Sequence, residues 1–154
     1  MRTTKIISEN AKQTVELGKR LARCLKKGDI ICLFGDLGSG KTTFTKGIAQ
    51  GLCVSKNSVN SPTFVLLNIH KGRLPLFHFD LYRLDNIDEI LMIGYEEFFY
   101  GEGVSIVEWA EKLKKLLPEN HLSVKISLKK NNQRLIQISA RGSRYQELLK
   151  EFIK

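Results

Sequence analysis

The segment from Gly35 to Thr42, with the sequence GDLGSGKT, constrains this chain more than any other feature. It matches the pattern G-x-x-x-x-G-K-[ST], in which glycines let the backbone turn so that successive N–H groups point toward one anion. An apolar run typical of a buried parallel strand precedes the loop (29–34), and a helical segment follows it (43–52). The segment therefore predicts a nucleotide phosphate-binding loop between a strand and a helix.

The same pattern assigns roles to individual residues. The lysine reaches the β- and γ-phosphates, and the hydroxyl that follows it binds Mg²⁺. We therefore expect Lys41 to act on the phosphates of ATP and Thr42 to be a ligand of Mg²⁺. The contacts to the nucleotide are expected from seven consecutive residues, Leu37, Gly38, Ser39, Gly40, Lys41, Thr42 and Thr43.

Length and composition favour a single domain over residues 1–154. The chain has 42% hydrophobic and 27% charged residues, ordinary values for a globular protein with a proper core. No apolar run approaches the roughly 18 residues needed to cross a bilayer, and the N-terminus turns polar too early for a signal peptide. We expect a cytoplasmic protein without membrane association. Cys24, Cys32 and Cys53 lack metal or disulfide spacing and are interpreted as buried hydrophobic residues.

The formal net charge of +9 is high for 154 residues. Such a charge can mark contact with nucleic acid or with an acidic partner. It can equally be a lysine-rich, solvated surface, since the basic residues are scattered and none of them interleaves with aromatic residues. Charge alone leaves both interpretations open.

Strands and helices alternate early in the chain, and a hairpin precedes the last helix. We expect helices over 8–27, 43–52, 85–93 and 109–117 and after Ser143, with Ser8 or Asn10 capping the first and Ser143 the last. We expect strands within 59–68 and over 29–34, 74–82, 103–108, 121–128 and 133–140, with turns at 71–72 and 130–132. This pattern predicts an α/β fold of the P-loop NTPase type, a mixed, mostly parallel sheet flanked by helices with a C-terminal antiparallel hairpin.

Two acidic residues end apolar strands, where a phosphate-binding loop needs an acid for Mg²⁺ or its water shell. They are Asp80, after LFHF, and Glu108, after VSIV. We expect Glu108 to be linked to the metal and Asp80 to be linked to the metal or to position water. Each could instead cap the turn or helix that follows it.

Three further residues have more than one interpretation each. Thr63, in the segment Ser61-Pro62-Thr63, stands where switch segments place a hydroxyl near the γ-phosphate, or it is simply a turn residue. His78 shares a strand face with Asp80 and could orient that carboxylate, or it is a satisfied polar residue at the edge of the site. Trp109 either stacks on a partner, supports the site floor or packs in the core.

Four motifs in this order and spacing resemble the TsaE family, also called YjeE. They are GDLGSGKTT, SPTF at 61–64, HFDLYRL at 78–84 and VEW at 107–109. The resemblance covers the chain from its first helix to its last strand. It implies a Mg²⁺-dependent ATPase, slow alone, that works with the proteins TsaB and TsaD in making N6-threonylcarbamoyladenosine in tRNA. ATP hydrolysis would reset that complex between turnovers, and contact with tRNA itself would be indirect or weak.

The resemblance also implies residue roles. Lys41, Asp80, Glu108 and Thr63 correspond to catalytic positions, with Thr42 and Glu108 serving Mg²⁺. The first helix and the turn near Asn132 are expected to border the adenine base. Ala110 departs from the family pattern, in which many members carry proline after the tryptophan.

Other functions remain open at the level of sequence. A small-molecule kinase shares the loop, but no lid-like cluster of arginines is visible. A GTPase is disfavoured because the chain lacks an N-K-x-D segment. A nucleotide-gated binding module without useful turnover fits the same motifs. Arg83 is the only basic residue next to a candidate acid, and phosphoryl transfer uses such a cation in cis or from a partner.

Overall fold

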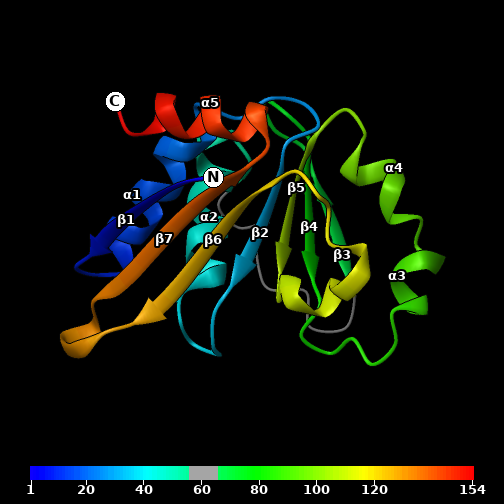
Figure 1. The fold of residues 1–154 in the computed structure, drawn as a ribbon, viewed down its shortest axis with the longest axis horizontal. Coiled ribbons are helices and arrows are strands. Elements are labelled where there is room, and N and C mark those ends of the chain that lie inside the picture. Colours follow the sequence, from blue (N-terminus) through cyan, green and yellow to red (C-terminus); the bar gives the residue numbers. More distant parts are fainter. Residues whose placement is uncertain (56–65) are drawn as a thin grey trace.

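The computed structural model describes residues 1–55 and 66–154, which form a mixed seven-stranded sheet in the order β1-β7-β6-β2-β5-β4-β3 (Figure 1). The strands are β1 (Arg2–Ser8), β2 (Ile30–Phe34), β3 (Leu67–His70), β4 (Leu76–Asp80), β5 (Val104–Glu108), β6 (His121–Leu128) and β7 (Arg134–Arg141). The inner strands β6, β2, β5 and β4 are parallel, whereas β1, β7 and β3 pair antiparallel. The predicted α/β fold and its C-terminal hairpin are confirmed.

Helices cover both faces of this sheet. They are α1 (Ala11–Ala22), α2 (Lys41–Gly51), α3 (Asp88–Met92), α4 (Tyr95–Phe99) and α5 (Ser143–Phe152), with 3-10 segments η1 (Ala110–Leu116) and η2 (Lys130–Asn132). Side chains of β2 alternate between two cores, Ile31 and Leu33 toward α1, α2 and α5, and Ile30 and Cys32 toward α3, α4 and η1. Burial on both faces explains why this strand reads as an unbroken apolar run.

The helices α1 and α2 pack together so closely that glycine is required where they touch. A Cβ atom on Gly47 would lie 2.2 Å from the carbonyl oxygen of Val15, and one on Gly18 would lie 2.6 Å from that of Phe44. Neither backbone can yield without moving its helix. This contact fixes the position of α2, the helix that follows the glycine-rich loop.

We expect Gly47→Ala to lower the free energy of unfolding by about 2 kcal/mol, because the added methyl group overpacks a helix interface made of backbone. Urea unfolding followed by circular dichroism measures it. The control is Lys46→Ala, on the exposed side of the same helix, with an expected change within about 0.5 kcal/mol. Equal stability of the two variants would show that the helices separate without cost.

The start of the chain differs from the sequence prediction. The helix predicted over 8–27 is α1, which spans only 11–22, and the strand β1 precedes it. β1 pairs along its whole length with β7, and this long-range pairing gives order to a segment whose side chains are mostly exposed. Of the two predicted caps, Asn10 is confirmed, since its side chain accepts a hydrogen bond from Gln13 N at 2.9 Å.

Three other elements also differ. The predicted helix over 85–93 is the single short turn α3, and α4 follows it unpredicted after Gly94, which has a φ of 69°. The helix predicted over 109–117 is the 3-10 segment η1, with non-helical backbone at Lys114. Ser143 was predicted to cap the last helix, but Gly142 holds that position and no side chain caps it.

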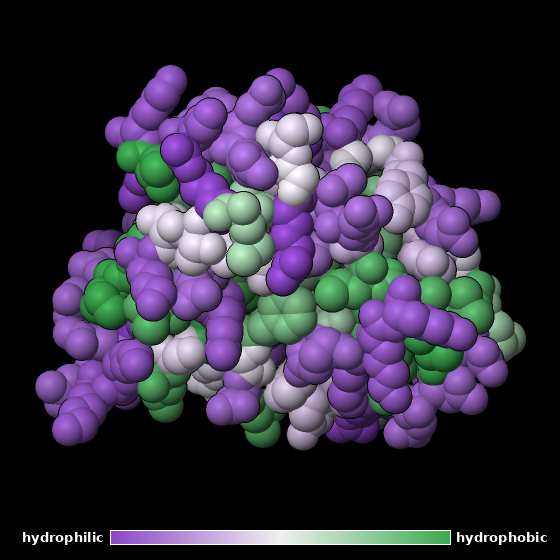
Figure 2. All heavy atoms as spheres, in the orientation of Figure 1, coloured by the Kyte–Doolittle hydropathy of each residue, from purple (hydrophilic) through white to green (hydrophobic). Residues whose placement is uncertain are grey.

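The surface and the cysteines complete the fold. Hydrophilic residues cover most of the face in Figure 2, with hydrophobic atoms exposed between them. Cys24 and Cys32 are buried as expected, whereas Cys53 is exposed, because it lies in the turn after α2 with a φ of 62°. No helix in the described ranges has the length and apolar character needed to cross a bilayer.

Candidate functional site

The glycine-rich loop joins the C-terminal end of β2 to the start of α2. Gly35 and Gly40 have φ values of 148° and 114°, which other residues rarely adopt. A Cβ atom on Gly35 would also lie 2.4 Å from the carbonyl oxygen of Ile126 in β6. The backbone turn thus favours glycine at both positions, and the close approach of β6 also requires it at Gly35.

Lys41 is the first residue of α2 and is 95% buried at the loop. Its Nζ donates to the carbonyl oxygens of Gly35, at 2.5 Å, and Asp36, at 2.9 Å. Burial lowers the pKa of Lys41, and the carboxylates of Glu108 and other nearby acids oppose that effect. The loop therefore holds a cation at its centre.

Trp109 covers this cation. The centroid of its ring lies 3.9 Å from Lys41 Nζ. The same centroid lies 5.0 Å from the ring centroid of Tyr82. Trp109 has a φ of 60°, a left-handed conformation that is costly for a bulky residue and needs the surrounding structure to hold it. The tryptophan supports the site, as one of its predicted roles required, and Ala110 after it begins η1.

Glu108 joins the loop helix to the sheet. Its Oε1 accepts a hydrogen bond from Thr42 Oγ1 at 2.8 Å, and its Oε2 lies 2.5 Å from Nε2 of His78. The carboxylate is 2% exposed. The predicted metal ligands Thr42 and Glu108, 66 positions apart in the sequence, are thus in direct contact.

Asp80 ends β4 in register with Glu108 at the end of β5, so the two carboxylates share one edge of the sheet. Its Oδ1 accepts a hydrogen bond from the backbone N–H of Tyr82 at 3.0 Å. The alternative role of capping the following turn is therefore present, and the same side chain also borders the cleft. His78 shares the strand face of Asp80, but its Nε2 contacts Glu108.

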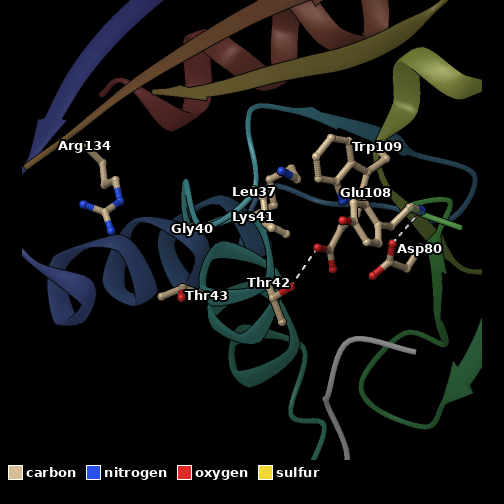
Figure 3. A pocket seen from close by; sticks show the side chains of 11 residues that line it. Leu37, Gly40, Lys41, Thr42, Thr43, Asp80, Glu108, Trp109 and Arg134 are labelled. Atoms are coloured by element: carbon tan, nitrogen blue, oxygen red, sulfur yellow. Dashed lines mark hydrogen bonds between the residues drawn. The ribbon is translucent and has the colours of Figure 1, made fainter. Parts of the chain in front are cut away.

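These residues line an open cleft of about 270 Å³ (Figure 3). Asp80, Glu108 and Trp109 stand at one end, the loop lies in the middle and Arg134 is at the other end. The full lining is Leu37, Gly38, Gly40, Lys41, Thr42, Thr43, Asp80, Tyr82, Glu108, Trp109 and Arg134. The structure brings together most of the residues that the sequence singled out.

Arg134 is a site residue that the sequence analysis missed. It begins β7, and its Nε donates to the carbonyl oxygen of Ser39 at 2.7 Å, while its Nη1 donates to that of Asn132 at 2.9 Å. A basic residue directly after the turn near Asn132 was the available signal. Only the pairing of β7 with β6, and of β6 with β2, brings it to the loop.

Several predicted residues lie elsewhere. The hydroxyl of Ser39 is buried beneath the loop, without a hydrogen-bond partner among the described residues. Asn132 does not line the cleft but holds Arg134 through its carbonyl group. Arg83 is exposed and is absent from the lining. The predicted switch residues Ser61 and Thr63 fall outside the described residues.

The arrangement fits Mg²⁺ only when phosphate completes its coordination. Within 1–55 and 66–154, no three His, Cys, Asp or Glu side chains gather closely enough to hold a metal ion by themselves. Mg²⁺ takes one or two protein oxygens together with phosphate oxygens and waters. The Thr42 hydroxyl and the Glu108 carboxylate, in contact beside the loop, are such a pair.

The chain is similar to known proteins in both sequence and fold. The model of the family "Threonylcarbamoyl adenosine biosynthesis protein TsaE" matches residues 8–136. A Bacillus subtilis (strain 168) protein named tRNA threonylcarbamoyladenosine biosynthesis protein TsaE is 41% identical over 152 residues, 98% of this chain and 94% of the relative. A Treponema pallidum (strain Nichols) protein of the same name is 37% identical, over 86% of this chain and 98% of its own length. The crystal structure of Bacillus subtilis YdiB is similar, with a TM-score of 0.82 and 36% identity over 99% of this chain and 95% of that one.

Proposed function

The chain belongs to the TsaE family, and from this membership and the site geometry we propose that it binds and hydrolyses Mg²⁺·ATP in tRNA threonylcarbamoyladenosine biosynthesis. The family places the protein in that modification pathway. The observation that carries the ATPase assignment is the 2.8 Å contact between Thr42 Oγ1 and Glu108 beside the buried ammonium of Lys41. A hydroxyl, an acid and a lysine at one glycine-rich loop are the groups that a triphosphate and its metal require.

Each group then has a task in hydrolysis. Backbone N–H groups of the loop and the N-terminus of α2 bind the phosphates, and Lys41 exchanges at least one of its carbonyl contacts for them. Thr42 and Glu108 would hold Mg²⁺, which supplies positive charge at the β- and γ-phosphate oxygens. Asp80, on the same edge of the sheet as Glu108, would accept a hydrogen bond from the attacking water.

Arg134 marks the end of the cleft away from these acids, so we assign it to the part of the nucleotide farther from the γ-phosphate. We expect Arg134→Ala to weaken ATP binding about tenfold, since loss of one charge-assisted hydrogen bond costs about 1.5 kcal/mol. Isothermal titration calorimetry measures this affinity. Arg141→Ala is the matched control, an exposed arginine at the opposite end of the same strand. Equal affinities of the two variants would remove Arg134 from the site.

Trp109 provides a direct test of nucleotide binding, because it is the only tryptophan of the chain and its ring covers Lys41. We expect Mg²⁺·ATP to change its fluorescence as the ammonium moves from the ring toward the phosphates. AMP should leave the emission unchanged, because it lacks the β- and γ-phosphates that Lys41 reaches. The same response to AMP as to ATP would contradict the assignment of the loop.

The role in the pathway is tested by reconstitution. Following the family resemblance, we propose that the protein acts with TsaB and TsaD and that hydrolysis resets their complex between turnovers. The chain is mixed with TsaB, TsaD, the threonylcarbamoyl-adenylate donor and tRNA, with and without ATP. The expected result is several modified tRNAs per TsaD with ATP and about one without it. Repeated turnover without ATP would overturn the resetting role.

A further inference from the structure

The residue that completes the contacts of Glu108 is His78, which is fully buried in β4. Thr42 holds one oxygen of the carboxylate, and His78 Nε2 lies 2.5 Å from the other. An ionised carboxylate can only accept hydrogen bonds, so Nε2 is the nitrogen that carries the proton and donates. The two partners come from different elements, Thr42 from α2 and His78 from the neighbouring strand β4.

The rest of the imidazole gains nothing comparable from the core. Its Nδ1 is buried without a hydrogen-bond partner among the described residues. A buried polar atom without a partner costs free energy, and an apolar side chain of similar size would avoid that cost. The contact of Nε2 with Glu108 is therefore the one polar interaction within the described ranges that accounts for a histidine at this position.

The carboxylate, by contrast, needs a second contact. The torsion that turns the carboxylate plane of a glutamate is broad, so a single hydrogen bond from Thr42 leaves that plane poorly fixed. A donor on the second oxygen fixes both the plane and the oxygen that faces Thr42. Contacts of this kind, one shell away from the metal, set the orientation of metal-binding carboxylates.

We propose that His78 is a positioning residue that fixes the Glu108 carboxylate for Mg²⁺ bound with nucleotide, an inference that rests on the proposed function. His78 itself touches neither the nucleotide nor the metal. It acts through the contact between Nε2 and Oε2. Its loss should therefore change the requirement for Mg²⁺ and leave the metal-free contacts of the loop with phosphate intact.

The test compares three variants, His78→Leu, His78→Gln and His78→Asn. The glutamine amide reaches the position of Nε2, whereas the asparagine amide ends near Nδ1 and falls short of Glu108. Each variant is titrated with Mg²⁺ at fixed ATP, and Trp109 fluorescence reports binding. Thermal unfolding and ATP binding in excess EDTA are measured alongside.

We expect the leucine and asparagine variants to need about 10-fold more Mg²⁺ for half-maximal binding. Their affinity for ATP in EDTA should match that of the unchanged protein, and the glutamine variant should recover most of the Mg²⁺ response. The leucine variant should unfold at a lower temperature than the unchanged protein, because it leaves the buried Glu108 carboxylate with one donor fewer. If it does not fold, the glutamine and asparagine pair carries the comparison.

Failure of the His78 role and failure of the proposed function give different results in this experiment. Equal Mg²⁺ requirements for the glutamine and asparagine variants, or an unchanged requirement in a folded leucine variant, would overturn the role of His78. Absence of any Mg²⁺-dependent ATP binding by the unchanged protein would instead overturn the proposed function. The unchanged protein is therefore measured first.

Discussion

Replacing Lys41 with alanine is expected to lower the affinity for ATP on the order of 100-fold, because about 3 kcal/mol of charge-assisted hydrogen bonding to phosphate is lost. The ammonium is buried at the centre of the loop, and no other lysine lines the cleft among the described residues. Water cannot replace it without loss, since a neutral water molecule does not offset the negative charge of the phosphates. Calorimetric titration with ATP, in the presence of Mg²⁺, measures the change.

Lys46→Ala is the matched control for this prediction. Lys46 is on the same helix, but it is exposed and does not line the cleft. Its removal lowers the net charge equally, so it reports the contribution of general electrostatic attraction. An affinity of Lys41→Ala equal to that of the control would refute the phosphate-binding role of the loop.

Glu108→Gln is expected to slow ATP hydrolysis on the order of 100-fold, which corresponds to about 2.7 kcal/mol of transition-state stabilisation. Glutamine keeps the volume of the buried side chain, so the sheet edge should remain folded. It removes the negative charge that Mg²⁺ needs. It also places an amide N–H₂ group, which can only donate, against one of the two donors, Thr42 or His78. Phosphate release over a range of Mg²⁺ concentrations measures the loss.

Glu119→Gln supplies the control, since this exposed residue precedes β6 at the end of the sheet opposite the loop. The Glu108 variant also separates hydrolysis from nucleotide gating. If modification of tRNA with TsaB and TsaD continues undiminished while hydrolysis stops, ATP serves only to gate docking. If modification stops after one round per TsaD, hydrolysis is required for resetting.

Much of the fold followed from local patterns. β2, the turn of the glycine-rich loop, β5 and the hairpin of β6 and β7 were predictable, because burial on two faces, glycine spacing and alternation are visible in neighbouring residues. β1 was not, since its order comes from pairing with β7 more than 120 positions away. The boundaries of α1 and the 3-10 geometry of η1 were also set by packing, which overrides local propensity.

The candidate site divides in the same way. Lys41, Thr42, Asp80 and Glu108 were visible in the sequence, because each follows a strand or opens a helix within a recognisable motif. Arg134 was not visible, because its place beside Ser39 depends on the order of three strands. The partner of His78 was also hidden, since alternation places it on the face of Asp80 without saying which carboxylate it contacts.

The sequence by itself determined the loop, the family and the chemical types that surround the cleft, because these depend on residues close together along the chain. The tertiary structure alone decided which groups touch. It placed Glu108 between Thr42 and His78 and brought Arg134 to the far end of the cleft. The physical reason is that strand order and register arise from contacts between distant segments. The free energy of such a contact depends on both segments together, so neither segment predicts it alone.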